Sequence, residues 1–220
     1  MCGRFALVVS KREVEKLFGL KMSEELTPRY NISPGQIAPV VVSEGAGGSK
    51  RIRFMRWGLV PSWAKDPSVG NRLINARCET VREKAAFRSS FLRRRALVPI
   101  SGFYEWKREG KVKQPYYSIL KNSRLFSLAG LWEYWERNEG ALETFTILTT
   151  TPNNLLRSIH DRMPVIVSPS DIDSWLWNGA DQETYARLCS PFPEGEMETY
   201  PVSRLVNRPE NDGKELIIRQ

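Results

Sequence analysis

The feature that most constrains the fold is a close succession of strand-like runs in the middle of the chain. Apolar and β-branched residues dominate four segments between residues 96 and 151, which read ALVPISGFYEWK, PYYSIL, RLFSLAGLWEYW and TFTILTTT. Short runs of this kind, separated by a few polar residues, are typical of neighbouring antiparallel strands. We therefore expect a mostly antiparallel β core.

Helical patterns stand at the flanks of this core. They lie at 10–18, after residue 79 in NARCETVREKAAFRSSF, at 168–177 and at 181–189, with Ser10 capping the first and Ser168 or Ser170 capping the third. Further strands are expected at 37–45 and 51–60 and a short one in ELIIR at 215–219, whereas 27–36 reads as a loop. Strands massed in the middle with helices at the flanks predict the α+β class, in one domain spanning 1–220.

A glycine-rich segment, GAGGSK at 45–50, invites comparison with a phosphate-binding loop. It lacks the spacing G-x-x-x-x-G-K-[ST] that places backbone N–H groups around phosphates. Clustered glycines between two strand-like runs usually mark a turn, so we predict a hairpin turn there.

The composition narrows the environment and the partners. The chain has 33 Lys and Arg against 25 Asp and Glu, a net charge of +8, which favours a polyanionic partner. No apolar run reaches the roughly 20 residues that span a bilayer, and the first residues lack the apolar core of a signal peptide. Three widely spaced cysteines predict neither a disulfide framework nor a zinc site. We expect a protein of the cytoplasm or nucleoid.

The N-terminus, Met-Cys-Gly-Arg-Phe, carries the most chemical information. A small residue after Met1 permits removal of the methionine, which leaves Cys2 with an α-amine beside its thiol. An α-amine with a pKa near 7.7–8.0 is roughly 10–17% neutral at pH 7, far more than a lysine amine. The neutral amine attacks an aldehyde, and the thiol of the same residue can then close a five-membered thiazolidine ring. An N-terminal cysteine is also often just a small buried residue.

Three polar residues are further candidates, each with a structural alternative. His160 is the only histidine, and a pKa near 6.5 suits it to proton transfer, although a lone histidine is usually structural. Glu105 lies between aromatic residues in GFYEW, where burial would raise the pKa of its carboxyl, but it also fits an outward-facing strand position. Asn75, in LINAR, is by default a turn or cap residue.

Arginines interleaved with aromatic residues suggest how a single strand of nucleic acid would bind. Arginines contact phosphates and aromatic faces stack on bases, which suits a single strand better than a duplex. Core packing is the alternative for the tryptophans. The candidates are Arg4, Arg29, Arg77, Arg162, Trp57, Trp63 and Trp106.

Seven segments together resemble one family, the SOS response-associated peptidase family, which shields abasic DNA. They are MCGRFA at 1–6, RYNISPGQ at 29–36, WGLVPSWAKD at 57–66, INARCETV at 74–81, LVPISGFYEW at 97–106, IHDRMPVI at 159–166 and PVSRLVN at 201–207. The resemblance implies a single α+β domain with a barrel-like core, and a basic groove for single-stranded DNA with Cys2 at its floor. It implies no metal and no cofactor, and we expect a monomer.

The resemblance also implies roles for individual residues. Cys2 would form a thiazolidine with the ring-opened abasic sugar, Asn75 would hold the N-terminal residue, and Glu105 would shuttle protons. His160 would assist sugar ring opening. The residues that match DNA-contacting positions are Arg4, Arg77 and Arg162, with Thr149 added to that set.

Two other functions fit the same residues. In the first, a thiol peptidase or autopeptidase, His160 would activate the Cys2 thiol, and the chain would cleave peptides or its own N-terminal segment. In the second, a non-covalent reader of modified or single-stranded DNA, Cys2 would merely line the pocket. Survival of a DNA complex under denaturing conditions separates a covalent function from a non-covalent one.

Overall fold

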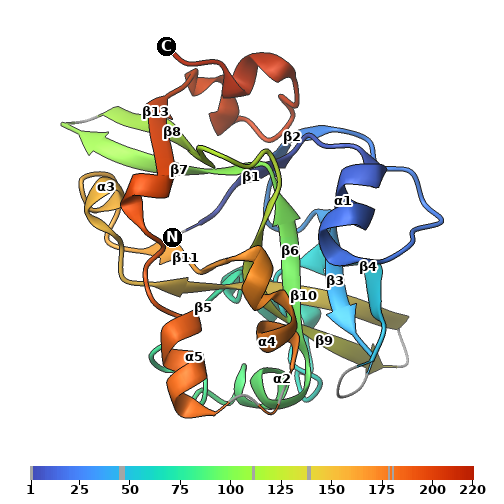
Figure 1. Cartoon of the computed structure of the whole chain (residues 1–220). Coiled ribbons are helices and arrows are strands. Elements are labelled where there is room, and N and C mark those ends of the chain that lie inside the picture. The colour runs from blue at the N-terminus through green and yellow to red at the C-terminus, as the bar shows by residue number, and fades with distance from the viewer. Residues whose placement is uncertain (1, 45–47, 111, 138–139, 178, 180) are drawn as a thin grey trace.

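In the computed structural model, which describes residues 2–44, 48–110, 112–137, 140–177, 179 and 181–220, the strands form two sheets (Figure 1). The smaller sheet has five strands in the order β13-β8-β7-β1-β2, and every neighbouring pair in it is antiparallel. Its strands are β1 (Phe5–Leu7), β2 (Arg29–Ile32), β7 (Gly102–Glu109), β8 (Val112–Leu120) and β13 (Met197–Pro201).

The larger sheet closes on itself. Strand β10 pairs with both β4 and β9, so that β10, β4, β3, β6 and β9 form a ring. Only the pairings of β10 with β4 and β5 are parallel. The mostly antiparallel, barrel-like α+β fold is therefore confirmed. The strands of this sheet are β3 (Ile37–Ser43), β4 (Lys50–Trp57), β5 (Asn75–Arg77), β6 (Arg95–Ile100), β9 (Phe126–Arg137), β10 (Gly140–Thr150), β11 (Met163–Pro164) and β12 (Ile166–Val167).

Short helices flank the sheets, as Figure 1 shows. They are α1 (Lys11–Phe18), α2 (Arg88–Arg93), α3 (Asn154–Arg157), α4 (Ile172–Leu176) and α5 (Gln182–Leu188). The predicted start of α1 is confirmed, because the Ser10 side chain accepts a hydrogen bond from the N–H of Glu13, whose carboxylate accepts one from the Ser10 N–H. None of the described helices has the length and apolar character needed to cross a bilayer.

The helix predicted after residue 79 is mostly wrong. Residues 79–87 form successive turns, and only α2 is helical. Val81 and Phe87 are both buried, yet a continuous helix would turn them to faces roughly 120° apart. The burial of both side chains therefore favours separate turns.

Other boundaries also differ from the predictions. The run 96–107 is two strands, because the chain leaves the barrel at Ser101, whose N–H donates to Ala6 O, and enters the smaller sheet. The predicted loop 27–36 contains β2, and the predicted strand at 215–219 is a 3-10 turn over Lys214–Ile217.

The remaining predictions concern the starts of the helices expected at 168–177 and 181–189 and the hairpin turn at 45–50. The segment 168–177 begins with a 3-10 turn, and Ser168 makes no capping hydrogen bond through its side chain. Asp181 caps α5 by accepting from the N–H of Thr184. Strands β3 and β4 pair as far as Ser43 and Lys50, as a hairpin requires, while residues 45–47 of the predicted turn lie outside the described residues.

Candidate functional site

The last residues of β10 bring two distant segments together. Strand β5 pairs with β10 on one side, with Asn75 opposite Ile147 and Arg77 opposite Thr149. Strand β11 pairs with the same end of β10, with Pro164 opposite Thr149. The INAR segment and the HDRMP segment, about 85 residues apart in the sequence, thus lie beside one strand.

Cys2 lies where the start of the chain meets this edge. Its side chain is fully buried, and the Asn75 side-chain amide donates a hydrogen bond of 2.8 Å to Cys2 O. Burial raises the pKa of the Cys2 thiol far above its ordinary value, and the nearby charge of Glu105 raises it further. The predicted contact between Asn75 and the N-terminal residue is present, and Cys2 is close to Glu105. Met1 lies outside the described residues.

Glu105 comes from the smaller sheet. Strand β7 pairs with β1, and the N–H of Tyr104 donates to Arg4 O. The residues that follow Cys2 therefore lie alongside β7. The Glu105 side chain is 2% exposed, and this burial raises the pKa of its carboxyl to about 7. The prediction of an outward-facing strand residue is wrong, and the carboxyl can both donate and accept a proton near neutral pH.

His160 follows α3 and is partly exposed. Its Nδ1 lies 3.0 Å from the backbone N of Arg162 and 2.8 Å from Asp161 Oδ1. The nitrogen accepts from Arg162 when it carries no proton, and donates to Asp161 when it carries one. Burial lowers the pKa of His160, so the neutral ring that accepts from Arg162 is favoured at neutral pH. The proton of the neutral ring is then on Nε2.

A cavity of about 500 Å³ brings three of the predicted residues together, Glu105, Trp106 and His160. It is lined by Glu105, Trp106, Arg108, Lys113, His160 and Asn207. The indole N–H of Trp106 donates to Asn207 Oδ1 at 2.7 Å, and the Arg4 guanidinium lies over the Trp106 ring at 6.0 Å. Cationic side chains therefore surround an opening whose wall holds a carboxyl and an imidazole.

The predicted DNA-contacting arginines differ in how free they are. Arg4 Nη1 donates to Asn31 Oδ1 and Val206 O, and Arg29 forms an ion pair with Asp212. Arg162 is mostly buried and binds Glu79. Arg77, in contrast, is exposed at the end of β5.

Two other predicted DNA contacts do not fit the structure. Trp57 is 1% exposed, its ring stacks against Phe145, and its indole N–H donates to Ile74 O. Thr149 is fully buried, with its hydroxyl 3.4 Å from Ala76 O. Neither side chain has surface to offer a base or a phosphate. Trp63 is 60% exposed and Trp106 is half-buried in the cavity wall, so both rings remain accessible.

Several residues at the site were not singled out in the sequence. Arg108 and Lys113 lie near the ends of the hairpin strands β7 and β8, and Asn207 ends a 3-10 turn over Arg204–Asn207. Glu79 stands inside the INARCETV segment, four residues after Asn75. Contacts between remote segments place these residues. The sequence carried a signal for two of them only: Glu79 shares the INARCETV segment with Asn75, and Asn207 ends the PVSRLVN segment.

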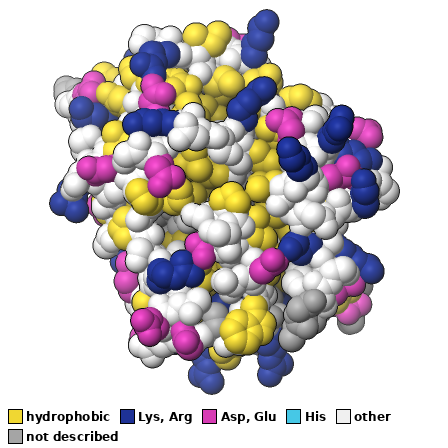
Figure 2. All heavy atoms as spheres, in the orientation of Figure 1, with side chains coloured by type: hydrophobic (Ala, Val, Ile, Leu, Met, Phe, Trp, Pro, Cys, Tyr) yellow, Lys and Arg dark blue, Asp and Glu magenta, His cyan; other side chains and the backbone are white. Residues whose placement is uncertain are grey.

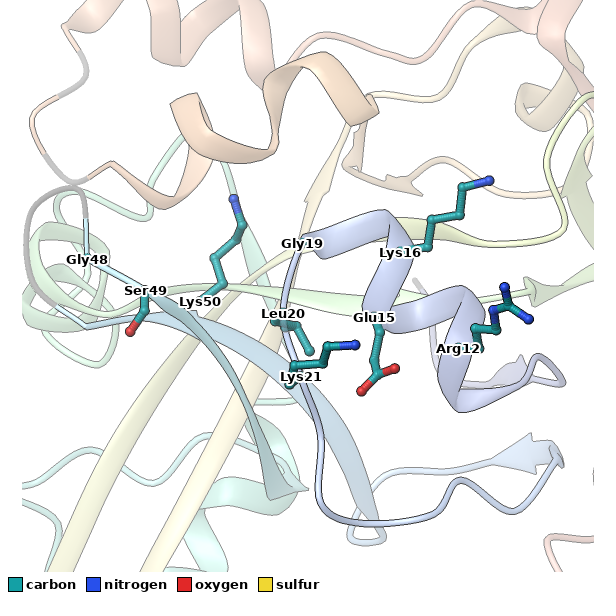
Figure 3. A pocket seen from close by; sticks show the side chains of 9 residues that line it. All are labelled: Arg12, Glu15, Lys16, Gly19, Leu20, Lys21, Gly48, Ser49 and Lys50. Atoms are coloured by element: carbon teal, nitrogen blue, oxygen red, sulfur yellow. The ribbon is translucent and has the colours of Figure 1, made fainter.

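A larger cavity lies elsewhere. About 820 Å³ in volume, it is lined by Arg12, Glu15, Lys16, Gly19, Leu20, Lys21, Gly48, Ser49 and Lys50. Figure 3 shows the side chains of Arg12 and Lys16 pointing away from β4 rather than converging with Lys50. The cations around this cavity therefore do not form a common anion site.

Charge on the face shown in Figure 2 is also dispersed. Lys and Arg side chains lie mostly around its margin with Asp and Glu among them, and hydrophobic side chains gather near the middle. The part of the chain that the structure describes contains no group of three or more His, Cys, Asp or Glu placed to hold a metal ion.

A closed barrel packed with a second, five-stranded sheet, and a buried cysteine near a buried carboxyl where the two sheets meet, describe the fold and its candidate site. The model of the SOS response associated peptidase (SRAP) family matches residues 1–209, and the chain belongs to this family. Abasic site processing protein YoqW of Bacillus subtilis is 42% identical, with 99% of each chain covered. Abasic site processing protein HMCES of Xenopus tropicalis is 31% identical over 98% of this chain and 77% of its own length.

The solved structures agree. A crystal structure of a protein from Bacteroides thetaiotaomicron superposes over the full length of both chains with a TM-score of 0.89, at 26% identity. The resemblance found in the sequence is thus confirmed at the level of family and fold.

Proposed function

We propose that this protein processes abasic sites in DNA by forming a covalent thiazolidine between Cys2 and the ring-opened sugar. The substrate is a single-stranded stretch that contains the abasic site. The proposal requires removal of Met1, because only then does Cys2 carry an amine. It is supported by the abasic site processing proteins among the relatives and by the chemistry of the residues around Cys2.

One observation carries the proposal: Cys2 lies between an amide that holds it and a buried carboxyl that titrates near neutrality. Asn75 Nδ2 donates to Cys2 O, and Asn75 Oδ1 is buried without a hydrogen-bond donor among the described residues. A free α-amine at Cys2 supplies N–H donors in the same residue. Glu105, with a pKa raised to about 7 by burial, supplies the acid and base.

The reaction is a condensation that releases one water molecule. The neutral amine of Cys2 adds to the aldehyde carbon of the open sugar and gives a carbinolamine. Protonated Glu105 donates its proton to the hydroxyl, which leaves as water, and an imine remains. The thiol sulfur then adds to the imine carbon while the thiol proton passes to the imine nitrogen, so that the C=N double bond becomes a single bond and the ring closes with a carbon–sulfur bond.

His160 acts before this condensation. An abasic sugar is mostly a closed ring, and opening it requires a proton to move between the ring oxygen and the hydroxyl at the anomeric carbon. The imidazole lines the same cavity as Glu105 and has a lowered pKa, so it is largely a neutral ring whose Nδ1 accepts from the Arg162 N–H and whose Nε2 carries the proton. In this proposal the Nε2–H donates a hydrogen bond to the ring oxygen of the sugar while that oxygen takes up the proton of the anomeric hydroxyl and its bond to the anomeric carbon breaks.

The preference for a single strand rests on exposed cations and rings. Arg77, Arg108 and Lys113 supply positive charge, while Trp63 and Trp106 offer rings for stacking. Base stacking on aromatic side chains needs unpaired bases, which a duplex does not present. The partner is therefore single-stranded DNA or a junction between single and double strand.

A thiol peptidase is less well supported. A cysteine peptidase attacks with a thiolate, which requires a lowered thiol pKa. The pKa of the Cys2 thiol is instead raised by burial and by Glu105. Thiazolidine formation does not need a standing thiolate, because the thiol adds to an imine that is already activated.

The test is denaturing electrophoresis of protein incubated with an abasic single-stranded oligonucleotide. Wild-type protein lacking Met1 should give a product that survives denaturation, and Cys2→Ala should give none while still binding the oligonucleotide natively. Cys2→Ser should give an imine that borohydride traps but no stable ring. Full cross-linking by Cys2→Ala would exclude the mechanism, and native binding without any covalent product in the wild type would identify a non-covalent reader.

A further inference from the structure

Arg162 is held by a dense set of hydrogen bonds. Its Nη1 and Nη2 donate to the two carboxylate oxygens of Glu79 at 2.7 and 2.9 Å, and Nη2 also donates to Thr149 O at 2.7 Å. A bidentate pair of this kind fixes orientation as well as distance. The guanidinium is 10% exposed and the Glu79 side chain is 48% exposed, so the carboxylate covers the guanidinium from the solvent side.

This ion pair joins the two segments that β10 brings together. Glu79 follows β5, where the N–H of Cys78 donates to Thr149 O at 3.0 Å. Arg162 precedes β11, which pairs with the same residue of β10. Glu79 therefore ties the position of Arg162 to the β5–β10 edge that also carries Asn75.

The backbone of Arg162 continues the connection to His160. Its N–H donates to Nδ1 of His160 at 3.0 Å, which leaves the proton of the neutral ring on Nε2. Arg162, whose side chain binds Glu79, thus uses its backbone N–H to favour the neutral tautomer of His160 that carries the proton on Nε2. The hydrogen bond depends on where residue 162 lies, and Glu79 helps to fix that position together with Thr149 O and the pairing of β11 with β10.

Charge acts in the same direction. His160 is flanked by Asp161 and Arg162 in its own loop, and by Glu105 and Arg108 of β7 and Lys113 of β8 in the cavity. Burial is the main cause that lowers the pKa of His160, the positive charge of the N-terminus comes next, and the positive charge of Arg162 makes a smaller contribution in the same direction. Glu79 is the carboxylate that offsets this charge, and hydrogen bonds from Arg162 keep the pKa of Glu79 below its ordinary value.

We propose that Glu79 is a positioning residue for His160, which it orients through Arg162 so that the imidazole can open the abasic sugar. The inference rests on the proposed function for its catalytic consequence. It gives Arg162 a role in the support of His160 through its backbone N–H. Glu79 itself does not touch the reacting atoms.

The experiment compares Glu79→Gln with Glu83→Gln, both prepared without Met1. Glu83 is an exposed glutamate four residues further along the same turns and serves as the matched control. The rate of covalent product is measured under single turnover at several concentrations of abasic oligonucleotide, from pH 5.5 to 8.5. Glu79→Gln should lower the maximal rate about tenfold and change the half-saturating concentration by less than about twofold, whereas Glu83→Gln should match the wild type.

A second readout needs no DNA. The chain contains one histidine, so a single imidazole signal can be followed by NMR as the pH changes. Loss of the carboxylate charge leaves Arg162 uncompensated and disfavours the imidazolium, so the pKa of His160 should fall in Glu79→Gln. Glu79→Asp, which keeps the charge on a shorter side chain, should restore that pKa in part.

The outcomes separate the inference from the proposed function. A wild type that forms no covalent product contradicts the proposed function, and the histidine titration still tests the positioning. Wild-type rates and an unchanged histidine titration in Glu79→Gln overturn the inference. A changed half-saturating concentration with an unchanged maximal rate overturns it as well, because Glu79 would then act on DNA binding. If Glu79→Gln does not fold, Glu79→Asp is measured with the same criteria.

Discussion

Two glutamates are equally buried, one in each sheet, and their surroundings differ. Glu133, on β9 of the barrel, is 2% exposed and lies 3.0 Å from Arg94 Nη1 and 3.0 Å from Ser90 Oγ. Glu105, on β7, has the same exposure, but its pKa is raised to about 7 by burial, and it faces Cys2 and the cavity. The Arg94 guanidinium balances the charge of the Glu133 carboxylate, and the Ser90 hydroxyl donates a hydrogen bond to it. Glu105 stands where its proton can be given up and regained.

This difference teaches how burial is to be interpreted here. A buried carboxylate with a cation and a hydroxyl beside it supports the fold, because removing one partner leaves the other uncompensated. A buried carboxyl whose pKa is raised toward neutral pH lowers the stability of the folded protein when it ionises. Such groups cluster at functional sites. Glutamine in place of either glutamate keeps the shape and removes the charge, which makes the two positions directly comparable.

The largest effect is expected on the chemistry of Glu105→Gln. Glutamine cannot donate a proton to the carbinolamine, so the rate of covalent product should fall about 100-fold, at the lower limit of general acid–base catalysis. In the wild type the rate should pass through a maximum, because the reaction needs both a protonated Glu105 and a neutral amine. The protonated carboxyl is lost as the pH rises above 7, and the neutral amine is lost as the pH falls. The variant should lose the decline on the alkaline side. Single-turnover rates from pH 5.5 to 8.5 measure both, and an unchanged rate would return Glu105 to a structural role.

The same substitution should stabilise the fold at alkaline pH. The folded-state pKa of Glu105 is raised above that of the unfolded chain, so folding loses stability as pH rises from about 4.5 toward 7. Above pH 7, Glu105→Gln should increase the free energy of unfolding by about 3 kcal/mol. At pH 4.5 the two proteins should unfold alike. Urea unfolding at both pH values decides this, and a difference that is constant with pH would contradict the raised pKa.

Glu133→Gln should give the opposite pair of results. Its charge-assisted hydrogen bonds with Arg94 and Ser90 are weakened, so the free energy of unfolding should fall by about 2 kcal/mol at pH 7. The rate of covalent product per folded molecule should equal that of the wild type. A slower reaction in this variant, measured well below its unfolding midpoint, would mean that the two carboxyl sites are not independent.

The smallest difference between the variants is expected in DNA binding. If about three phosphates are engaged, the logarithm of the binding constant should fall with the logarithm of salt concentration at a slope near −2, in both variants and in the wild type. Fluorescence anisotropy with Cys2→Ala as the background isolates non-covalent binding. Equal affinity for an intact duplex, or affinity independent of salt, would contradict a single-stranded DNA partner.

What the sequence could predict follows the range of the interactions. Helix α1 was predictable because Ser10 and Glu13 satisfy each other locally. The closure of the barrel was not evident from the residues themselves, since β10 pairs with β4 across about 90 residues. Burial of Trp57 and Thr149 was missed for the same reason, because the faces of these strands are covered by segments remote in sequence.

The site shows the same division. Cys2, Asn75, Glu105 and His160 stand in segments recognisable as a set, although each residue alone had a plausible structural role. The carboxylate–guanidinium pair of Glu79 and Arg162 joins residues 83 positions apart, and no local pattern indicates it. Residues that act through a contact between remote segments therefore became visible only in the structure.

The most direct test of the central claim is the requirement for the free amine of Cys2. One batch of protein that retains Met1, verified by intact mass spectrometry, is divided, and half is treated with methionine aminopeptidase. Both halves are incubated with abasic single-stranded DNA and denatured. An amide nitrogen is not basic, because its lone pair is delocalised into the carbonyl, so it forms no imine. Only the treated half should give a stable adduct, and a stable adduct on protein that retains Met1 would contradict the mechanism.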